Sequence, residues 1–195
     1  MLKLCDFGFA RNLPTKNSKE IMTDYVATRW YRAPELLLSQ SYGKPVDIWS
    51  IACIMAELID GQPLFPGDSE IDQLALIQKI IDPLTLEQRE AFNRHARFKG
   101  LKFKEVKKID SLEKRYLGKI SKRGMAFMKA ILKMDPKERL SSKDALEHPY
   151  FEDLRAIEIN EKIIQKSDLS KITSLEGPHL EGSFKIIREE RANLE

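Results

Sequence analysis

The sequence predicts a mainly α-helical domain followed by a tail. Its 195 residues have room for one domain plus an extension, and 42 % of them are hydrophobic and 32 % charged, as in an ordinary globular protein. Residues 44–60 place apolar side chains on every face of a helix, and residues 68–81 repeat Ile and Leu at helical spacing. Helix-capping serines precede two later apolar periods, at Ser121 and Ser141.

The first third of the chain begins with less regular patterns. Leu and Lys alternate over residues 1–5, which predicts a short strand. Residues 9–32 are polar with weak periodicity and are expected to form a long loop, a kind of segment that is usually functional in compact domains. Pro34 favours the start of a short helix.

The helix predicted over residues 44–60 requires neighbours on all sides, because a helix that is apolar all round is buried. Its apolar run is too short to span a bilayer, and Gly61 provides a C-terminal stop. In the next helix, Ser69 and Asp72 have capping-box spacing and Pro83 marks the end.

The second half alternates between irregular and helical patterns. Residues 84–120 are predicted to be irregular and strongly basic, followed by helices that start at Ser121 and Ser141. Charges of both signs alternate beyond residue 153, where we place a domain boundary. The tail, 154–195, is expected to be largely irregular, with short helical turns at most over 157–167.

Composition excludes several classes of protein. A net charge of +3 does not argue for nucleic acid or membrane binding, and two cysteines are too few for a disulfide framework. The first residues lack the apolar region of a signal peptide, so we expect a protein that is neither secreted nor membrane-bound. The three histidines lack zinc-ligand spacing with the cysteines, so no zinc site is expected.

Asp6-Phe7-Gly8 is the first motif with chemical content. A carboxylate at the end of a strand can hold Mg²⁺ against the phosphates of a nucleotide, and the glycine allows a sharp turn directly after it. Taken alone, the tripeptide is weak evidence, and a plain turn is favoured over a metal site.

Five further motifs follow in order. Residues 23–35 read Thr-Asp-Tyr-Val-Ala-Thr-Arg-Trp-Tyr-Arg-Ala-Pro-Glu, and Asp47-Ile48-Trp49-Ser50 opens the apolar helix. Pro63-Leu64-Phe65-Pro66-Gly67 comes after that helix, and Asp135-Pro136-Lys137-Glu138-Arg139 and His148-Pro149-Tyr150-Phe151 come later. Together these motifs resemble the protein kinases of the group that contains the cyclin-dependent and mitogen-activated kinases, over residues 1–151. Within it the chain resembles the cyclin-dependent-kinase-like family.

The resemblance implies the C-terminal lobe of the protein-kinase fold over residues 1–153, with the activation segment at 6–35 and an insert at 84–120. It implies ATP and Mg²⁺ as cofactors of the full-length enzyme, with Cys5 and Asp6 on the nucleotide side and Asp6 as the metal ligand. Thr28 and Arg29 are the implied substrate-positioning residues.

The resemblance also implies a phosphorylation switch at Thr23 and Tyr25. The arginines expected to order its phosphates are Arg11, Arg29 and Arg32, since guanidinium groups bind phosphate in pairs. Three structural residues are implied as well. Glu35 and Arg139 are expected to form a buried ion pair, and the family's catalytic loop is the expected partner of Asp47.

The N-terminal lobe and the catalytic loop of the family precede its Asp-Phe-Gly motif, so both are expected to be absent from this chain, and no catalytic residue is retained. We therefore expect a serine/threonine protein kinase in full-length form and an inactive chain alone. We also expect an aggregation-prone chain with an apolar patch on helix 44–60. The alternative function is a non-catalytic binding or scaffold module that uses the basic insert.

The basic insert leaves three readings open: a solvated face, a docking surface for an acidic protein partner at 84–120, or contact with nucleic acid, of which the last is least favoured. The implied partners are protein substrates and, for Thr23 and Tyr25, an upstream activating kinase or autophosphorylation. The implied locations are the cytoplasm, the nucleus and the cilium.

Overall fold

The computed structural model describes residues 3–10, 12, 28–38, 41–101 and 110–175. The chain divides into two compact units, Met1–Tyr150 and Phe151–Glu195, close to the boundary expected near residue 153. The described residues are mainly helical and contain no strand. None of the described helices is long and apolar enough to cross a lipid bilayer.

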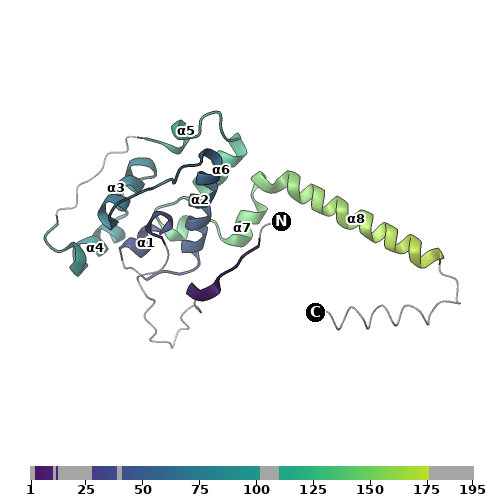
Figure 1. Ribbon diagram of the computed structural model, residues 1–195, viewed down its shortest axis with the longest axis horizontal. Helices are drawn as coiled ribbons and strands as arrows, with labels where there is room; N and C mark the ends of the chain where they lie inside the picture. The colour runs from purple at the N-terminus through teal and green to yellow at the C-terminus, as the bar shows by residue number, and fades with distance from the viewer. Residues whose placement is uncertain (1–2, 11, 13–27, 39–40, 102–109, 176–195) are drawn as a thin grey trace. The chain divides into compact units, whose positions relative to one another are not determined.

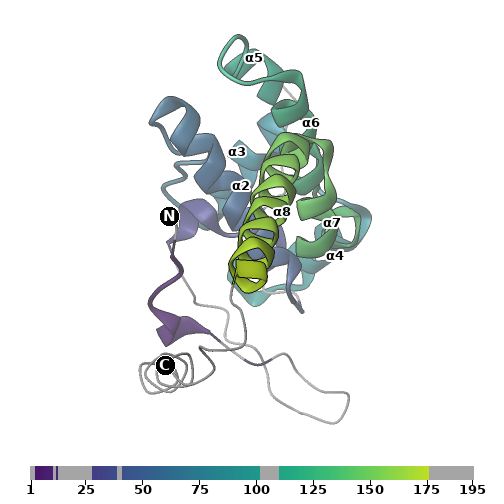
Figure 2. The same ribbon diagram turned by 90° about the vertical axis from the view of Figure 1, so that its right-hand side faces the viewer.

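Helix α2 (Pro45–Asp60) is the centre of the first unit. Helices α1 (Pro34–Leu37) and α3 (Glu70–Ile80) lie on one side of it, and α6 (Lys122–Ile131) and α7 (Ser142–Glu147) lie on the other (Figures 1 and 2). The fully buried Trp49 of α2 stacks on Phe65, with ring centroids 5.8 Å apart. The core thus forms around one face of α2.

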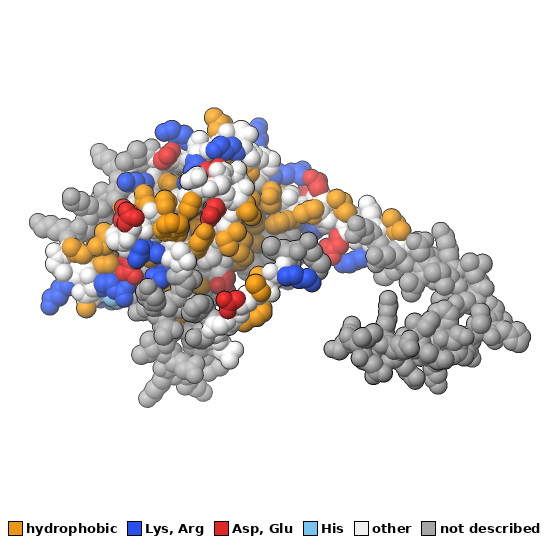
Figure 3. Space-filling view, viewed as in Figure 1, with side chains coloured by type: hydrophobic (Ala, Val, Ile, Leu, Met, Phe, Trp, Pro, Cys, Tyr) orange, Lys and Arg blue, Asp and Glu red, His pale blue; other side chains and the backbone are white. Residues whose placement is uncertain are grey.

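The opposite face of α2 remains exposed. Gly61 ends the helix in the left-handed conformation with φ 73°, as predicted. Ile51, Ile54 and Leu58, spaced three and four residues apart, are 51 %, 49 % and 82 % exposed. Hydrophobic side chains also gather in the middle of the space-filling view, over the region of α2 (Figure 3). The expected apolar patch on this helix is therefore present, whereas aggregation of the chain stays a prediction.

The predicted helix starts are confirmed by side-chain caps. The hydroxyl oxygens of Ser69, Ser121 and Ser141 each accept a hydrogen bond from the backbone N–H three residues later, at 3.0–3.2 Å. The second half of the expected box at α3 differs, since the Asp72 carboxylate accepts from the N–H of Asp68 and not of Ser69. Each cap satisfies a donor that the helix leaves unpaired.

The prediction that residues 84–120 are irregular is wrong for much of that stretch. It contains α4 (Leu86–Arg94), the short 3-10 helix η3 (Ala96–Phe98) and α5 (Leu112–Arg115). Thr85 and Gln88 form a complete capping box at the start of α4, and Phe92 stacks on Phe98 at 4.4 Å. The sequence of α4 is polar, so its periodicity does not indicate a helix. The capping box and the stacked Phe92–Phe98 pair stabilise it.

The end of this region is tied to the loop after α2. Arg115 donates hydrogen bonds to both carboxylate oxygens of Asp60, at 3.0 and 3.3 Å. It also donates to the carbonyl oxygens of Gln62, Pro63 and Leu64. The hydrogen bonds from Arg115 hold the pKa of Asp60 below its ordinary value.

The strand predicted over residues 1–5 is absent from its described part, 3–5. A strand needs a neighbour to complete its hydrogen-bond ladder, and the described residues hold no other strand. Leu4 and Phe7 are accordingly 85 % and 70 % exposed.

The second unit contains α8 (Glu152–Leu175), so the prediction of a largely irregular tail is wrong for residues 154–175. This stretch holds no Gly or Pro to interrupt a helix, and Lys162 pairs with Glu158 one turn earlier at 2.7 Å. Acidic Glu152 and Asp153 occupy the first turn, where they complement the helix dipole. Residues 176–195 lie outside the described part.

Candidate functional site

Asp6 occupies a tight turn at the start of the predicted activation segment. It precedes the 3-10 helix η1 (Phe7–Phe9), and its Oδ1 accepts the N–H of Gly8 at 3.2 Å. Its φ of 59° makes it the one non-glycine residue with positive φ among those described. Aspartate tolerates this conformation because its side chain can bond the local backbone. The turn therefore presents an exposed carboxylate with its second oxygen available.

The residues around Asp6 fit a Mg²⁺–nucleotide site only in part. Cys5 next to it is an exposed free thiol. In the described ranges no group of three or more His, Cys, Asp or Glu side chains could enclose a metal ion. Mg²⁺ is commonly held by one or two carboxylates together with substrate phosphates, so Asp6 suits the role of a single ligand.

The turn at residues 29–31 is anchored by bonds to distant residues. Arg29 Nη1 donates to the carbonyl oxygen of Asp68 at 2.9 Å, and Trp30 Nε1 donates to that of Gly67 at 3.2 Å. The buried Gln73 of α3 donates to the Trp30 carbonyl and accepts from the Gly67 N–H. A Cβ at position 67 would lie 2.6 Å from the Gln73 backbone, so this approach requires glycine. The predicted substrate-positioning Arg29 is thereby fixed, while Thr28 before it is exposed.

Tyr31 fastens the same turn to α2. Its hydroxyl donates to the Glu57 carboxylate at 2.6 Å, and Ser50 Oγ donates to its carbonyl oxygen at 2.9 Å. The hydrogen bond to Glu57, together with burial, raises the pKa of Tyr31 above its ordinary value. The phenol therefore stays protonated and keeps the bond at neutral pH.

Arg32 is buried and lies beside a carboxylate. Its Nη1 lies 3.7 Å from Glu70 Oε1, at the first residue of α3. Arg97 of η3 donates to both oxygens of the same carboxylate, at 2.6 and 2.7 Å. Of the predicted phosphorylation switch, Thr23, Tyr25 and the third arginine, Arg11, lie outside the described residues.

Glu35 and Arg139 form the expected ion pair. Two parallel hydrogen bonds of 2.7 and 2.8 Å join the guanidinium and the carboxylate, and both side chains are buried. The remaining donors of Arg139 reach the carbonyl oxygens of Lys133, Met134 and Pro45. All five N–H groups of the guanidinium are therefore used. The guanidinium also lies 4.9 Å from the Trp49 ring centre, which ties the pair to the core.

Asp47 is exposed in the first turn of α2. Among the described residues, no side chain or backbone group pairs with its carboxylate.

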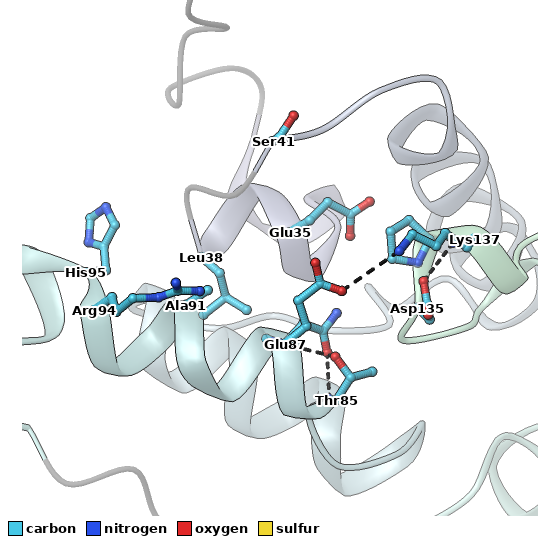
Figure 4. Close-up of a pocket in the computed structure, with 12 residues that line it drawn as sticks. Glu35, Leu38, Ser41, Thr85, Glu87, Ala91, Arg94, His95, Asp135 and Lys137 are labelled. Carbon is cyan, nitrogen blue, oxygen red and sulfur yellow. Dashed lines mark hydrogen bonds and ion pairs between the residues drawn. The ribbon is translucent and has the colours of Figure 1, made fainter.

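A groove of about 470 Å³ runs beside α4. One wall is formed by α4 from Glu87 to Arg94 and by His95 after it, and the other by α1 and by residues 135–137 at the start of the 3-10 helix η4 (Pro136–Glu138) (Figure 4). Glu35 and Leu38 lie at its α1 side, and Lys137 reaches across to Glu87 at 4.0 Å. Acidic and basic side chains both line it, so its charge alone favours no ligand class.

Sequence reasoning did not identify Glu70, Gln73 and Arg97, which lie around the 29–31 turn and Arg32. Each acts through a partner at least 27 positions away, and no local pattern signals such a contact. The cap at Thr85 and Gln88 did carry a signal, because the spacing of a capping box is present in the sequence.

The geometry agrees with comparisons to known proteins. The family model described as protein kinase domain matches residues 1–151. Cyclin-dependent kinase-like 5 of Mus musculus is 54 % identical over 158 residues, which are 81 % of this chain and 17 % of that protein. Cyclin-dependent kinase-like 2 of Oryctolagus cuniculus is 46 % identical over 153 residues, which are 78 % of this chain and 26 % of that protein.

A third relative, cyclin-dependent kinase-like 4 of Mus musculus, is 42 % identical over 163 residues, 83 % of this chain and 46 % of that protein. The chain thus spans less than half the length of each of these relatives. The buried Glu35–Arg139 pair and the anchored 29–31 turn lie inside the matched range. The chain therefore belongs to the protein kinase family, within which it is similar to the cyclin-dependent kinase-like proteins.

Proposed function

We propose that this chain forms the substrate-side part of a serine/threonine protein kinase that phosphorylates protein substrates in its full-length form. The observation that carries the proposal is the anchored turn at 29–31, which continues directly into the buried Glu35–Arg139 pair. This arrangement fixes Arg29 beside Thr28, the two residues proposed to position the substrate. Positioning of reactants is a large part of how kinases accelerate phosphoryl transfer.

Asp6 is the residue proposed to hold Mg²⁺, with Cys5 beside the nucleotide. The ion would neutralise charge on the phosphates of ATP when bound. The chain's own contribution is the left-handed turn, which keeps the carboxylate exposed and uses only Oδ1 for the Gly8 N–H.

Phosphorylation of Thr23 and Tyr25, by an upstream kinase or by autophosphorylation, is the proposed switch. Arg29 donates to the Asp68 carbonyl and Arg32 lies 3.7 Å from Glu70, so both arginines contact the 67–73 region. A phosphate adds close to two negative charges, which guanidinium groups bind in pairs.

The chain alone is proposed to be inactive. Its sequence contains no His-Arg-Asp motif and no Gly-rich phosphate loop. It therefore lacks the base that accepts the substrate proton and the lysine that holds the phosphates.

A chimera tests this function. The portion of cyclin-dependent kinase-like 5 that precedes the aligned region is joined to this chain, and transfer of labelled phosphate to a mixed Ser/Thr/Tyr peptide library is measured. We expect activity on Ser and Thr in the chimera, none in the chain alone, and none in a chimera with Asp6→Asn. A folded chimera that binds ATP but transfers no phosphate would contradict the proposal.

The groove beside α4 favours a second candidate function, a binding module for a protein partner at 84–120. Arg94 and Lys99 are exposed cations of this region, and Arg94 lines the groove. Binding of a poly-glutamate peptide and of a DNA oligonucleotide at 50 and 200 mM salt separates the two ligand types. Peptide binding that persists at the higher salt supports docking, and equal loss of both ligands supports a solvated face.

A further inference from the structure

A second pocket lies where the ends of three helices meet. Its volume is about 200 Å³, and residues at the C-terminal ends of α3 and α6 and at the start of α5 line it. Ile81, Leu112 and Leu132 are buried core residues, and Ile80 beside them is half-buried. This pocket shares no lining residue with the groove beside α4, so it is a separate feature of the first unit.

Contacts between the three helices hold the walls of this pocket. The N–H of Asp110 donates to the carbonyl oxygen of Lys79 at 3.1 Å, which joins the end of α3 to the residues before α5. Lys129 of α6 forms an ion pair with Glu113 of α5. The pocket is therefore preformed, and a ligand binds it without having to order its walls.

The size of the pocket limits what it can hold. An apolar cavity of about 150 Å³ accommodates one benzene molecule, whereas sites for drug-sized ligands and cofactors have about 300–1,000 Å³. A pocket of about 200 Å³ thus has room for one large apolar side chain and is too small for a nucleotide. Its aliphatic lining favours an aliphatic side chain such as that of leucine.

The charged residues of the pocket indicate what accompanies that side chain. Two acidic and two basic residues line it, namely Asp82, Glu113, Lys129 and Lys133. Glu113 and Lys129 neutralise each other, and Asp82 takes part in a further interaction of the chain. The backbone of Lys133 is fixed, because its carbonyl oxygen accepts from Arg139 Nε at 2.8 Å. Among the described residues, no acidic side chain pairs with the Lys133 ammonium group. One cation beside the apolar floor is therefore left for a carboxylate of the ligand.

We propose that this pocket docks a segment of a partner protein in which a leucine stands next to an acidic residue. The leucine side chain fills the floor formed by Ile81, Leu112 and Leu132, and the neighbouring carboxylate pairs with Lys133. An apolar centre with a charged rim is the usual anatomy of a protein interface. The proposal goes beyond phosphoryl transfer and does not rest on it.

Short peptides test the site in the full 195-residue chain. The probe is Gly-Ser-Leu-Glu-Ser-Gly, blocked at both ends. Three matched peptides carry alanine in place of the leucine, or glutamine or lysine in place of the glutamate. Because binding of one side chain is weak, it is followed by NMR titration of the isoleucine and leucine methyl signals. Thermal melts establish that each variant is folded.

Two matched pairs of variants locate the binding. Ile80→Asp places a charge at the apolar lining, and its control is Ile71→Asp at an exposed isoleucine in the first turn of the same helix. Lys133→Glu reverses the rim charge, and its control is Lys143→Glu at an exposed lysine of α7 that lines neither pocket.

We expect the alanine peptide and the Ile80→Asp variant each to weaken binding by about tenfold, because the apolar contact is lost. Lys133→Glu should weaken binding of the glutamate peptide by about three- to fivefold, and the lysine peptide should restore it. The two control variants should change affinity by less than about twofold. If Ile80→Asp fails to fold, the charge exchange at Lys133 decides the question.

Several outcomes would overturn the proposal. Equal binding of the leucine and alanine peptides would exclude an aliphatic anchor, and equal loss in Lys133→Glu and Lys143→Glu would exclude the rim contact. Absence of methyl shifts in the unsubstituted chain would mean that the pocket is closed or filled by the chain itself. A dimer in sedimentation velocity that Ile80→Asp abolishes and Ile71→Asp does not would make the occupant a second copy.

The fate of this pocket is separable from that of the kinase function. In the chimera, Ile80→Asp should leave phosphate transfer to the peptide library unchanged. An inactive chimera together with peptide binding that follows Ile80 and Lys133 would reject the kinase function and retain the docking site. An active chimera whose chain binds none of the peptides would do the reverse.

Discussion

Residues 3–10 and 28–38 lie at the two ends of the predicted activation segment, and they are held in different ways. The first stretch exposes Leu4 and Phe7 and presents Asp6 on a local turn. The second is bonded to α2 and α3 and ends in a buried ion pair. The residues proposed to position the substrate are therefore held by this chain's own core. The residue proposed to hold the metal depends on local backbone geometry.

The largest effect is expected at the buried pair. Glu35→Gln leaves the Arg139 charge buried without its partner, which costs about 3–5 kcal/mol. Urea denaturation followed by circular dichroism measures this loss. Glu87→Gln, which removes an exposed carboxylate paired with Lys137, is the control and should change stability by less than about 0.5 kcal/mol. Similar values for the two variants would show that the pair does not anchor the segment.

A smaller effect is expected where the insert is tied to α2. Arg115→Met removes hydrogen bonds to the Asp60 carboxylate and should cost about 1.5–3 kcal/mol, measured in the same urea assay. Lys114→Met on the same helix removes an exposed charge and its 3.8 Å pair with Asp110, and serves as the control.

The same pair has a defined pH dependence. Because Arg115 lowers the pKa of Asp60 in the folded state, its contribution is present above the ordinary value of 3.8 and is lost as pH falls through the depressed pKa. The stability difference between the unsubstituted chain and Arg115→Met should therefore shrink below that value. A difference that stays constant down to pH 2 would exclude this linkage.

The exposed face of α2 should affect association more than stability. Replacing Ile51, Ile54 and Leu58 by Gln removes an exposed apolar patch, so self-association in sedimentation velocity should fall. The free energy of unfolding should change by about 1 kcal/mol or less. Unchanged association would show that this patch does not drive it.

The smallest stability effect is expected at Asp6. Asp6→Asn keeps a residue that tolerates positive φ and should shift stability by less than about 0.5 kcal/mol. In the chimera the same change should abolish phosphate transfer. A loss of stability comparable to that of Glu35→Gln would remove the contrast between the two ends of the segment.

Local signals predicted much of the fold. The bounds of α2, its stop at Gly61 and the serine caps of three helices follow from interactions within one or two turns. The prediction of a strand at 1–5 was wrong for its described residues, 3–5, because strand pairing depends on residues elsewhere in the chain. The prediction of an irregular tail was wrong for residues 154–175, because alternating charges are as compatible with a helix as with a loop.

The candidate site was predictable to a lesser degree. Glu35 and Arg139 were expected only through the family resemblance, since 104 positions separate them. Glu70, Gln73 and Arg97 act through long-range contacts that neither periodicity nor capping indicates.

The separation between Glu35 and Arg139 also bears on how the first unit folds. A contact across 104 positions closes a long loop, so it is expected to form only after the helices between the two residues have assembled. Such late contacts mainly govern the rate of unfolding and have little influence on the rate of folding. The ion pair would then slow unfolding, so that the end of the predicted activation segment stays attached to the folded first unit for longer.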